Sequence, residues 1–462
     1  MLTILLLALA CNTDKPGDDT APTGDSDTTG ETGDSDTTGE TGDTDTTGET
    51  GDTGGAGPVT LTWNLRPDAG LAAPDAAALR LGDGAWEAID VEGEWAVDDP
   101  QQRYQLVMAC VPTFGEPSIF LIDATPEELP APRLACPWLD SESQIAVSLR
   151  VEDLSDGETA LATIGSEALM ATTLMPSGNL SPVAGSLDTS LAMTAVIPSG
   201  RSTFALGVER EQTIKAGVIA MSTLGLADTI QETLVSPPLT VNGEAVSTAT
   251  TISLWTAGGT LAELGWSFNN KLSWGAPPKA LVEEGDMLLV LAQDDGEHGR
   301  FMSVGPPGAK LAYDGVDGEC SVAVSGTKDG LKLEGSAVSP GDGWFFTFEA
   351  RSSVGVSSSW RVFTQPDRSN DTASIVLPNP TDIPGFDAAW DPADFTTVRG
   401  GIFAVSMGGE AAPPMRAFPE ALSAAILWRI AGTGSGLVGP LRLLGLSEPL
   451  TVVELTTLPA IK

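Results

Sequence analysis

The residues whose spacing most resembles a chemical site lie near the C-terminal end of the chain. The segment Gly434–Gly439 has the spacing of the dinucleotide-binding glycine fingerprint, and Glu454 follows it after a strand-like run. In that chemistry a pyrophosphate binds a helix N-terminus, and the acidic residue binds a ribose hydroxyl. Pro440 and Gly445 interrupt the helix that such a site needs. The pattern therefore favours a glycine-rich hairpin followed by a last strand.

Three weaker patterns also have a structural explanation. Ser325 and Lys328 have the S-x-x-K spacing of a serine nucleophile and its lysine, but that pair belongs at the start of a helix. Here the two residues lie between alternating, strand-like runs. His298, the single histidine of the chain, lies in an acidic, glycine-containing stretch that is typical of an exposed hairpin turn. Asp371 and Asp382 could serve glycoside chemistry, yet 63 acidic residues make such a pair uninformative. The sequence predicts no catalytic residue, no cofactor and no metal site.

The chain has four cysteines. Cys110 ends the strand-like run YQLVMAC, and Cys136 precedes Pro137. The two lie close in sequence within one expected module of a chain that carries export features, so we predict that they form a disulfide. Cys320 is then predicted to be a buried free thiol, and Cys11 belongs to the N-terminal segment described below.

The elements between these residues are predicted to be strands. From residue 57 onward, short runs with period-two alternation are separated by Gly, Asp and Pro turns, as in VTLTWNL at 59–65 and SIFLIDA at 118–124. This rhythm predicts an all-β fold, with two or three antiparallel β-sandwich modules in tandem. We place the modules at 57–145, 146–308 and 309–462, where 146–308 is either one large module or two small ones with a seam near 236–238. Helical alternatives are few: 167–173 is short and uncapped, and 421–430 is the best helix candidate, with a strand as its alternative.

The tryptophans bear on the choice between a binding surface and a core. The chain has eleven tryptophans and two tyrosines. Exposed tryptophans on a sandwich face could stack against sugars, whereas buried ones fill sandwich cores, and we favour the core. Gly82–Trp86 and Gly341–Trp344 each join a tight turn to a tryptophan, and both are interpreted as hairpins that feed a buried aromatic residue.

Charge excludes one class of partner. The formal net charge is −40. Nucleic acids require patches of Lys and Arg to neutralise their phosphates, so we expect no nucleic-acid partner.

The N-terminus predicts export and anchoring. Residues 1–10, MLTILLLALA, are uncharged and end in a small residue, as a secretory signal does. Together with Cys11 they resemble the lipobox of bacterial lipoproteins. The resemblance implies a cleaved signal peptide at 1–10 and a mature chain that starts at a lipidated Cys11. In that family the cysteine carries two or three acyl chains, and two are enough for stable membrane anchoring.

Residues 11–56 are predicted to be a lipidated cysteine followed by a disordered acidic tether. The nonamer TGDSDTTGE or TGDTDTTGE occurs three times, and the segment holds −12 of the net charge. A segment with almost nothing apolar to bury stays disordered, with a mean reach of roughly 35–40 Å. Its aspartates resemble calcium loops and its threonines could carry glycans, but a solvated spacer is favoured. Such tethers resemble those of lipoproteins from Gram-negative predatory and gliding bacteria.

A second resemblance concerns the body of the chain. LPNPTDIPGFDAAW, at 377–390, resembles a motif of uncharacterised secreted bacterial β-sandwich proteins, and it implies no known activity.

Taken together, the sequence predicts a non-enzymatic, lipid-anchored protein of the cell envelope, in the outer membrane of a Gram-negative bacterium. Its partners would be the membrane, through the anchor, and an unknown protein or glycan. Two alternatives stay open. One is a carbohydrate-binding surface protein that uses exposed tryptophans, and the other is a carboxylate-dependent hydrolase.

Overall fold

The computed structural model describes most of the chain from Gly57 onward. The described residues are 57–67, 71–113, 115–138, 144–165, 167–184, 188–196, 203–235, 239–241, 244–246, 248–267, 271–294, 299–307, 320–327, 330–337, 344–352, 358–367, 369–391, 395–407, 426, 450–456 and 460–461. The predicted signal peptide, Cys11 and the predicted tether lie outside these residues and stay predictions.

The regular secondary structure of the described residues is almost entirely β-strand. Residues Gly57–Lys462 form one compact unit, distinct from Met1–Ala56. Short 3-10 turns occur at η3 (Lys279–Leu281), η4 (Pro380–Asp382) and η5 (Ala388–Trp390). In the segment 167–173, for which a helix was the alternative, Glu167–Thr172 form strand β9. Of segment 421–430 only Ile426 is described, and it is helical and buried. The all-β fold class predicted from the sequence is confirmed.

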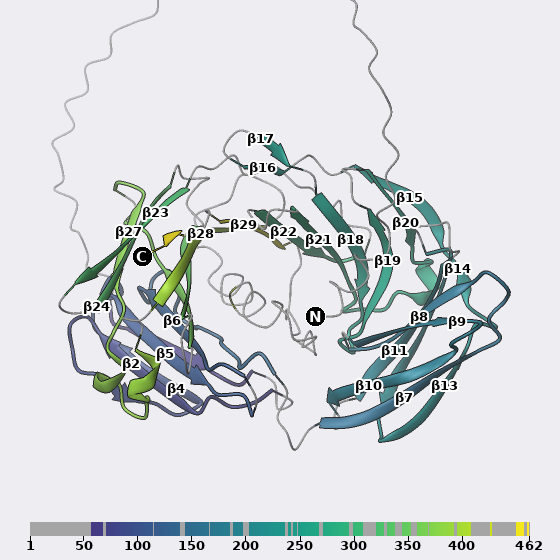
Figure 1. Cartoon of the computed structure of the whole chain (residues 1–462), viewed down its shortest axis with the longest axis horizontal. Helices are drawn as coiled ribbons and strands as arrows, with labels where there is room; N and C mark the ends of the chain where they lie inside the picture. The colour runs from purple at the N-terminus through teal and green to yellow at the C-terminus, as the bar shows by residue number, and fades with distance from the viewer. Residues whose placement is uncertain are drawn as a thin grey trace, which may run out of the picture. The chain divides into compact units, whose positions relative to one another are not determined.

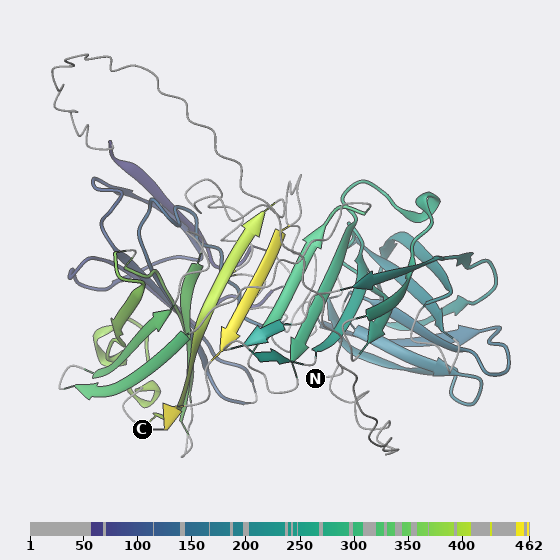
Figure 2. The same ribbon diagram turned by 90° about the horizontal axis from the view of Figure 1, so that it is seen from above.

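The largest sheet has thirteen strands, and Figures 1 and 2 show how it draws them from distant parts of the chain. In spatial order they are β19 (Leu261–Ser267), β18 (Thr248–Trp255), β21 (Met287–Asp294), β22 (Gly299–Gly305), β29 (Leu450–Thr456), β28 (Phe395–Met407), β25 (Trp344–Ser352), β26 (Ser359–Thr364), β6 (Ser118–Ala124), β5 (Tyr104–Cys110), β2 (Ala76–Leu81) and β3 (Glu87–Ala88), with β30 (Ala460–Ile461) also paired to β28. All its pairs are antiparallel except β26 with β6, which run parallel.

The thirteen-stranded sheet has a hydrophobic core on each of its two faces. In β5, Leu106 and Met108 belong to one hydrophobic cluster, whereas Val107 and Ala109 belong to the other. All four side chains are fully buried. Successive residues of a strand point to opposite faces, so a strand buried on both faces is apolar throughout. This explains why YQLVMAC has so little polar content.

Residues 144–228 form a two-sheet sandwich. One sheet has three strands: β10 (Ser177–Ala184), β7 (Gln144–Glu152) and β13 (Gly217–Ser222). The other has five: β14 (Ala227–Asp228), β12 (Ala205–Thr213), β11 (Asp188–Val196), β8 (Thr159–Ile164) and β9 (Glu167–Thr172). A third cluster fills the space between them, with Leu149 from β7 and Ala162 from β8 among its fully buried members. The pair β7–β13 is parallel and the other pairs of both sheets are antiparallel.

Four smaller sheets complete the described strands. They pair β1 (Val59–Asn64) with β4 (Glu92–Val97), β15 (Ile230–Val235) with β20 (Lys271–Ala276), β16 (Leu239–Val241) with β17 (Glu244–Val246), and β24 (Gly330–Ala337) with both β23 (Cys320–Thr327) and β27 (Thr372–Val376). The loop before Cys136 returns to β1, where Leu134 N donates to Asn64 O at 3.0 Å.

The thirteen-stranded sheet crosses the module boundaries expected from the sequence. It contains strands from 57–145, 146–308 and 309–462, so these ranges are not separate sheets. The first and last ranges meet where β6 pairs with β26, and the second and last meet where β22 pairs with β29. The division of the chain into these three modules stays a prediction.

Candidate functional site

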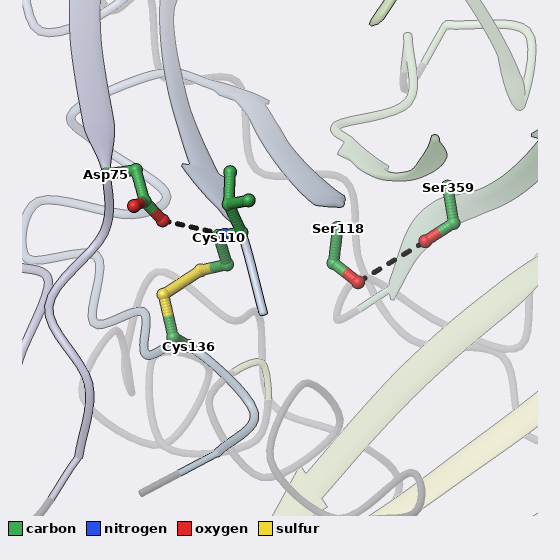
Figure 3. The surroundings of a disulfide bond; sticks show 6 residues. Asp75, Cys110, Ser118, Cys136 and Ser359 are labelled. Carbon is green, nitrogen blue, oxygen red and sulfur yellow. Dashed lines mark hydrogen bonds between the residues drawn. A yellow bond between two sulfur atoms is a disulfide. The ribbon is translucent and has the colours of Figure 1, made fainter. Parts of the chain in front are cut away.

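Cys110 and Cys136 form a disulfide at the end of β5, in the surroundings drawn in Figure 3. Their Cα atoms are 5.6 Å apart, and 26 positions separate them in the sequence. Both residues are fully buried. Thiol–disulfide exchange requires access of an attacking thiolate to a sulfur atom. A bond without solvent access is suited to holding β5 to the returning loop rather than to redox exchange.

The strands around the disulfide are linked by polar contacts that Figure 3 also shows. The Asp75 carboxylate accepts a hydrogen bond of 2.7 Å from Val111 N, directly after Cys110. Ser118 lies opposite Cys110 in the β5–β6 register, and its hydroxyl is 3.4 Å from the hydroxyl of Ser359 on β26. These contacts join β2, β5, β6 and β26 at one end.

The carboxylate of Asp123 is buried at the other end of the β6–β26 pair. Asp123 is 4% exposed, and Arg103 Nη2 lies 2.7 Å from its Oδ2. Thr364 donates to the same oxygen at 3.0 Å, and Gln365 N donates to the Asp123 carbonyl at 2.9 Å. Because the carboxylate is occupied by donors from its own chain, this arrangement fixes the register of two strands rather than presenting an acid to a substrate.

Tyr104 lies beside this cluster and is fully buried. Its hydroxyl donates to Leu129 O at 2.7 Å. Burial, reinforced by the charge of Asp123, raises the pKa of Tyr104 well above its ordinary value. The phenol therefore stays protonated and serves as a fixed donor to the loop that carries Cys136.

A second buried carboxylate ties the sandwich to the large sheet. Asp286, whose side chain is fully buried, receives two bonds from Arg210, at 2.9 and 2.7 Å. Its oxygens also accept from Ala257 N and Glu283 N, each at 2.9 Å. Arg210 belongs to β12, where the register with β11 shifts across Arg210–Glu211. Such a bulge reorients a side chain, which here brings a strand residue to a turn of another sheet.

The tryptophans occupy cores rather than an open face. Of the nine whose side chains the structure describes, five are buried and four are half-buried, and none is exposed. The buried ones are Trp63, Trp255, Trp274, Trp360 and Trp390, and the half-buried ones are Trp86, Trp95, Trp138 and Trp266. The turn at Gly82–Trp86 was predicted to feed a buried tryptophan, but Trp86 is only half-buried. The guanidinium of Arg80 lies over its ring, 4.7 Å from the centroid.

The motif at 377–390 anchors part of this aromatic packing. Its two 3-10 turns are capped by Asn379 and Asp387, which accept bonds from Thr381 N and Ala389 N. The carbonyl of Trp390 accepts the indole N–H of Trp360 at 3.0 Å. The motif therefore packs into the same hydrophobic cluster as Val107 and Ala109, to which Leu377, Ile383 and Trp390 belong.

The other residues whose spacing suggested chemistry lie on antiparallel strands or outside the described residues. Glu454 lies on β29, which is antiparallel to both of its neighbours, whereas a dinucleotide unit needs parallel strands. Ser325 lies in the antiparallel strand β23, opposite Lys332, and not at a helix start. Gly434–Gly439, Lys328 and His298 lie outside the described residues.

The two carboxylates considered for glycoside chemistry, Asp371 and Asp382, lie on separate elements. Asp371 lies in the turn before β27, with a φ of 53°, and the exposed Asp382 belongs to η4. Within the described part of the chain, no group of three His, Cys, Asp or Glu side chains is arranged to hold a metal ion. No helix among those residues is both long and apolar enough to cross a membrane.

The stability of the folded chain should depend on pH through Glu263, which lies on β19. Burial raises the pKa of Glu263. The folded state therefore favours the protonated carboxyl, and stability falls as pH rises from the ordinary Glu range through the raised value. We expect Glu263→Gln to raise the urea midpoint at pH 7 and to leave it nearly unchanged at pH values below both pKa values. Glu94→Gln, at an exposed position of β4, is the control and should show no such difference. Equal effects of Glu263→Gln at both pH values would contradict the assignment.

Comparisons with known proteins identify no family. No family model matches the sequence, and no curated protein matches it. Among solved structures, a streptococcal ancillary pilin is similar with a TM-score of 0.15 and 7% identity, covering 56% of this chain and 93% of that chain. A tetra-tandem repeat from the extending region of a large adhesion protein is similar with a TM-score of 0.12 and 12% identity, covering 75% of this chain and 95% of that one. Likenesses with TM-scores this low carry no argument about function.

Proposed function

We propose that this chain is an exported, lipid-anchored protein of the cell envelope whose β-rich body serves as a structural or interaction module, without catalysis. The buried Cys110–Cys136 bond is the observation that carries the proposal, because structural disulfides persist in oxidising, extracytoplasmic compartments. The N-terminal run that ends in Cys11 supplies the resemblance to bacterial lipoproteins. The acidic repeat would hold the body away from the lipid surface.

The buried tryptophans and carboxylates favour this proposal over its two alternatives. A sugar-stacking face needs exposed aromatic rings, and none of the described tryptophans is exposed. Asp123 and Asp286, the two buried aspartates of the described chain, bind donors of their own chain. Neither observation supplies a site for a sugar or for carboxylate hydrolysis.

The anchor is tested by Cys11→Ser in the native host. We expect the unaltered chain to fractionate with membranes, and its N-terminal peptide to begin at Cys11 with added acyl mass. The variant should lose the acyl mass, and mass spectrometry of its N-terminal peptide reports this whether or not the apolar residues 1–10 are still removed. Ser26→Cys in the Cys11→Ser background is the matched control, since it restores a thiol outside the lipobox. An unaltered chain whose N-terminal peptide carries no acyl mass on Cys11 would refute anchoring through this residue.

A further inference from the structure

Strand β13 forms one edge of the three-stranded sheet of the sandwich, next to β7 (Figure 1). In the described part of the chain it pairs with β7 alone. Thr223 N donates to Glu152 O at 3.1 Å, so the peptide groups of residues 217, 219 and 221 face β7. Those of Val218, Ala220 and Ser222 therefore face away from the sheet.

This edge lacks the features that normally prevent strands from pairing. The segment 216–222, AGVIAMS, has no charged residue and no proline, in a chain of net charge −40. Val218 is 70% exposed and Leu224 is 74% exposed. By contrast β10, at the opposite edge, contains Pro182 and a register shift between Leu180 and Val183. Uncharged, apolar, straight edges are templates for another strand, whereas prolines and irregularities block pairing.

We propose that β13 is a self-association edge, which pairs antiparallel with β13 of a second copy about a two-fold axis at Ala220. In this register Ala220 lies opposite its own copy, and Val218 lies opposite Ser222 of the second copy. It is the symmetric register that uses all three outward-facing residues. Closed, isologous contacts of this kind are the commonest form of homodimer.

The exposed apolar residues Val218 and Leu224, together with the absence of charge in 216–222, favour a second copy as the occupant. Lys215 would lie opposite Gly225, so the register brings no like charges together. An acidic segment of another chain would meet no basic residue within 216–222. The pairing also places Val218 diagonal to Leu224 of the second copy, within reach for side-chain contact. In this pairing Ile219 and Met221 remain packed in the third hydrophobic cluster, between the two sheets of the sandwich.

The contact is small, and a six-residue strand pair is expected to be weaker than a permanent dimer interface. Tethering raises the effective concentration of neighbouring copies, so a weak edge contact is sufficient to cluster them. This consequence rests on the proposed anchoring, but the pairing does not. The test below uses unlipidated protein, so its failure and a failure of anchoring are distinguishable.

The test uses the full chain with Cys11→Ser and Cys320→Ser, in sedimentation velocity over a concentration series. We expect reversible dimerisation, weakened at least about tenfold by Ala220→Pro, because proline removes the outward N–H and leaves the bonds to β7 in place. Ala220→Ser, which keeps the N–H, should dimerise as the parent does. A parent that stays monomeric at every concentration, or an Ala220→Pro variant that dimerises equally, would overturn the proposal.

Cross-linking tests the register independently. Ala220→Cys should form a covalent dimer on mild oxidation, because directly opposed residues of an antiparallel pair lie within disulfide range. Val218→Cys should not, since its own copy lies two pairs away, whereas Val218→Cys with Ser222→Cys should cross-link. Covalent dimers from Val218→Cys and none from Ala220→Cys would overturn the two-fold at Ala220.

Discussion

Replacing Asp286 by alanine is expected to lower the free energy of unfolding by about 3 kcal/mol, because the largely buried Arg210 then keeps only the exposed Glu283, 3.1 Å from its Nε, as a counter-charge. The side chain of Arg210 is 15% exposed and that of Asp286 is fully buried. The same substitution removes the acceptor for Ala257 N and Glu283 N. Urea denaturation of the full chain measures the loss.

The ion pair between Arg150 and Glu152 gives a matched control for this prediction. Its atoms are 3.0 Å apart, but the two side chains are 61% and 42% exposed. Exposed pairs of this kind contribute about 0–1 kcal/mol, so Glu152→Ala should shift the urea midpoint little. Asp286→Asn should fall between the two variants, since it retains acceptors but loses the charge. A cost for Asp286→Ala no larger than that of Glu152→Ala would show that the buried cluster does not hold β12 to the large sheet.

Removing the disulfide is expected to cause the second large decrease in the free energy of unfolding. In the chain-entropy view, a bond that closes a loop of this length stabilises the folded state by about 3.5 kcal/mol, mainly by restricting the unfolded chain. We expect the double variant Cys110→Ala, Cys136→Ala to lose roughly that amount, measured by urea denaturation. The native far-ultraviolet circular dichroism should be retained, since the strands on either side keep their hydrogen bonds.

Reduction supplies the control for the disulfide prediction. Unfolding the unaltered chain in the presence of dithiothreitol should lower its stability to that of the double variant, while the variant itself should not respond. Peptide mapping without reduction should yield one cross-linked peptide that contains Cys110 and Cys136. Unchanged stability in the double variant, or separate Cys110 and Cys136 peptides, would contradict a structural disulfide and weaken the proposed export.

The sequence predicted the local elements well because their signal is local. Alternation with period two marks β1 and β7 directly, whereas β5 and β6 are short, nearly continuous apolar runs of the length of a strand. The resulting all-β class is confirmed. The proposed pairing of Cys110 with Cys136 could be reasoned from spacing, and the structure places these residues in bonding geometry. The preference for buried tryptophans likewise followed from composition, and it agrees with the described side chains.

The clusters around Asp123 and Asp286 could not be found in this way. Asp123 is one acid among 63, and its partners Arg103 and Thr364 lie 20 and 241 positions away. Nothing in the sequence near Arg210 indicates that a bulge will bring it to Asp286. Each cluster exists because distant strands bury a carboxylate together, and burial is a property of the assembled fold.

By itself, then, the sequence determined which segments become strands, since side-chain alternation acts within a few residues. Only the tertiary structure decided which strands share a sheet. The parallel pair of β6 with β26 and the insertion of β29 between β22 and β28 join segments far apart in the chain. Many apolar strands could satisfy the local rules equally. The choice among them depends on which combination buries both faces of the sheet, and that is settled only when all of the strands are packed together.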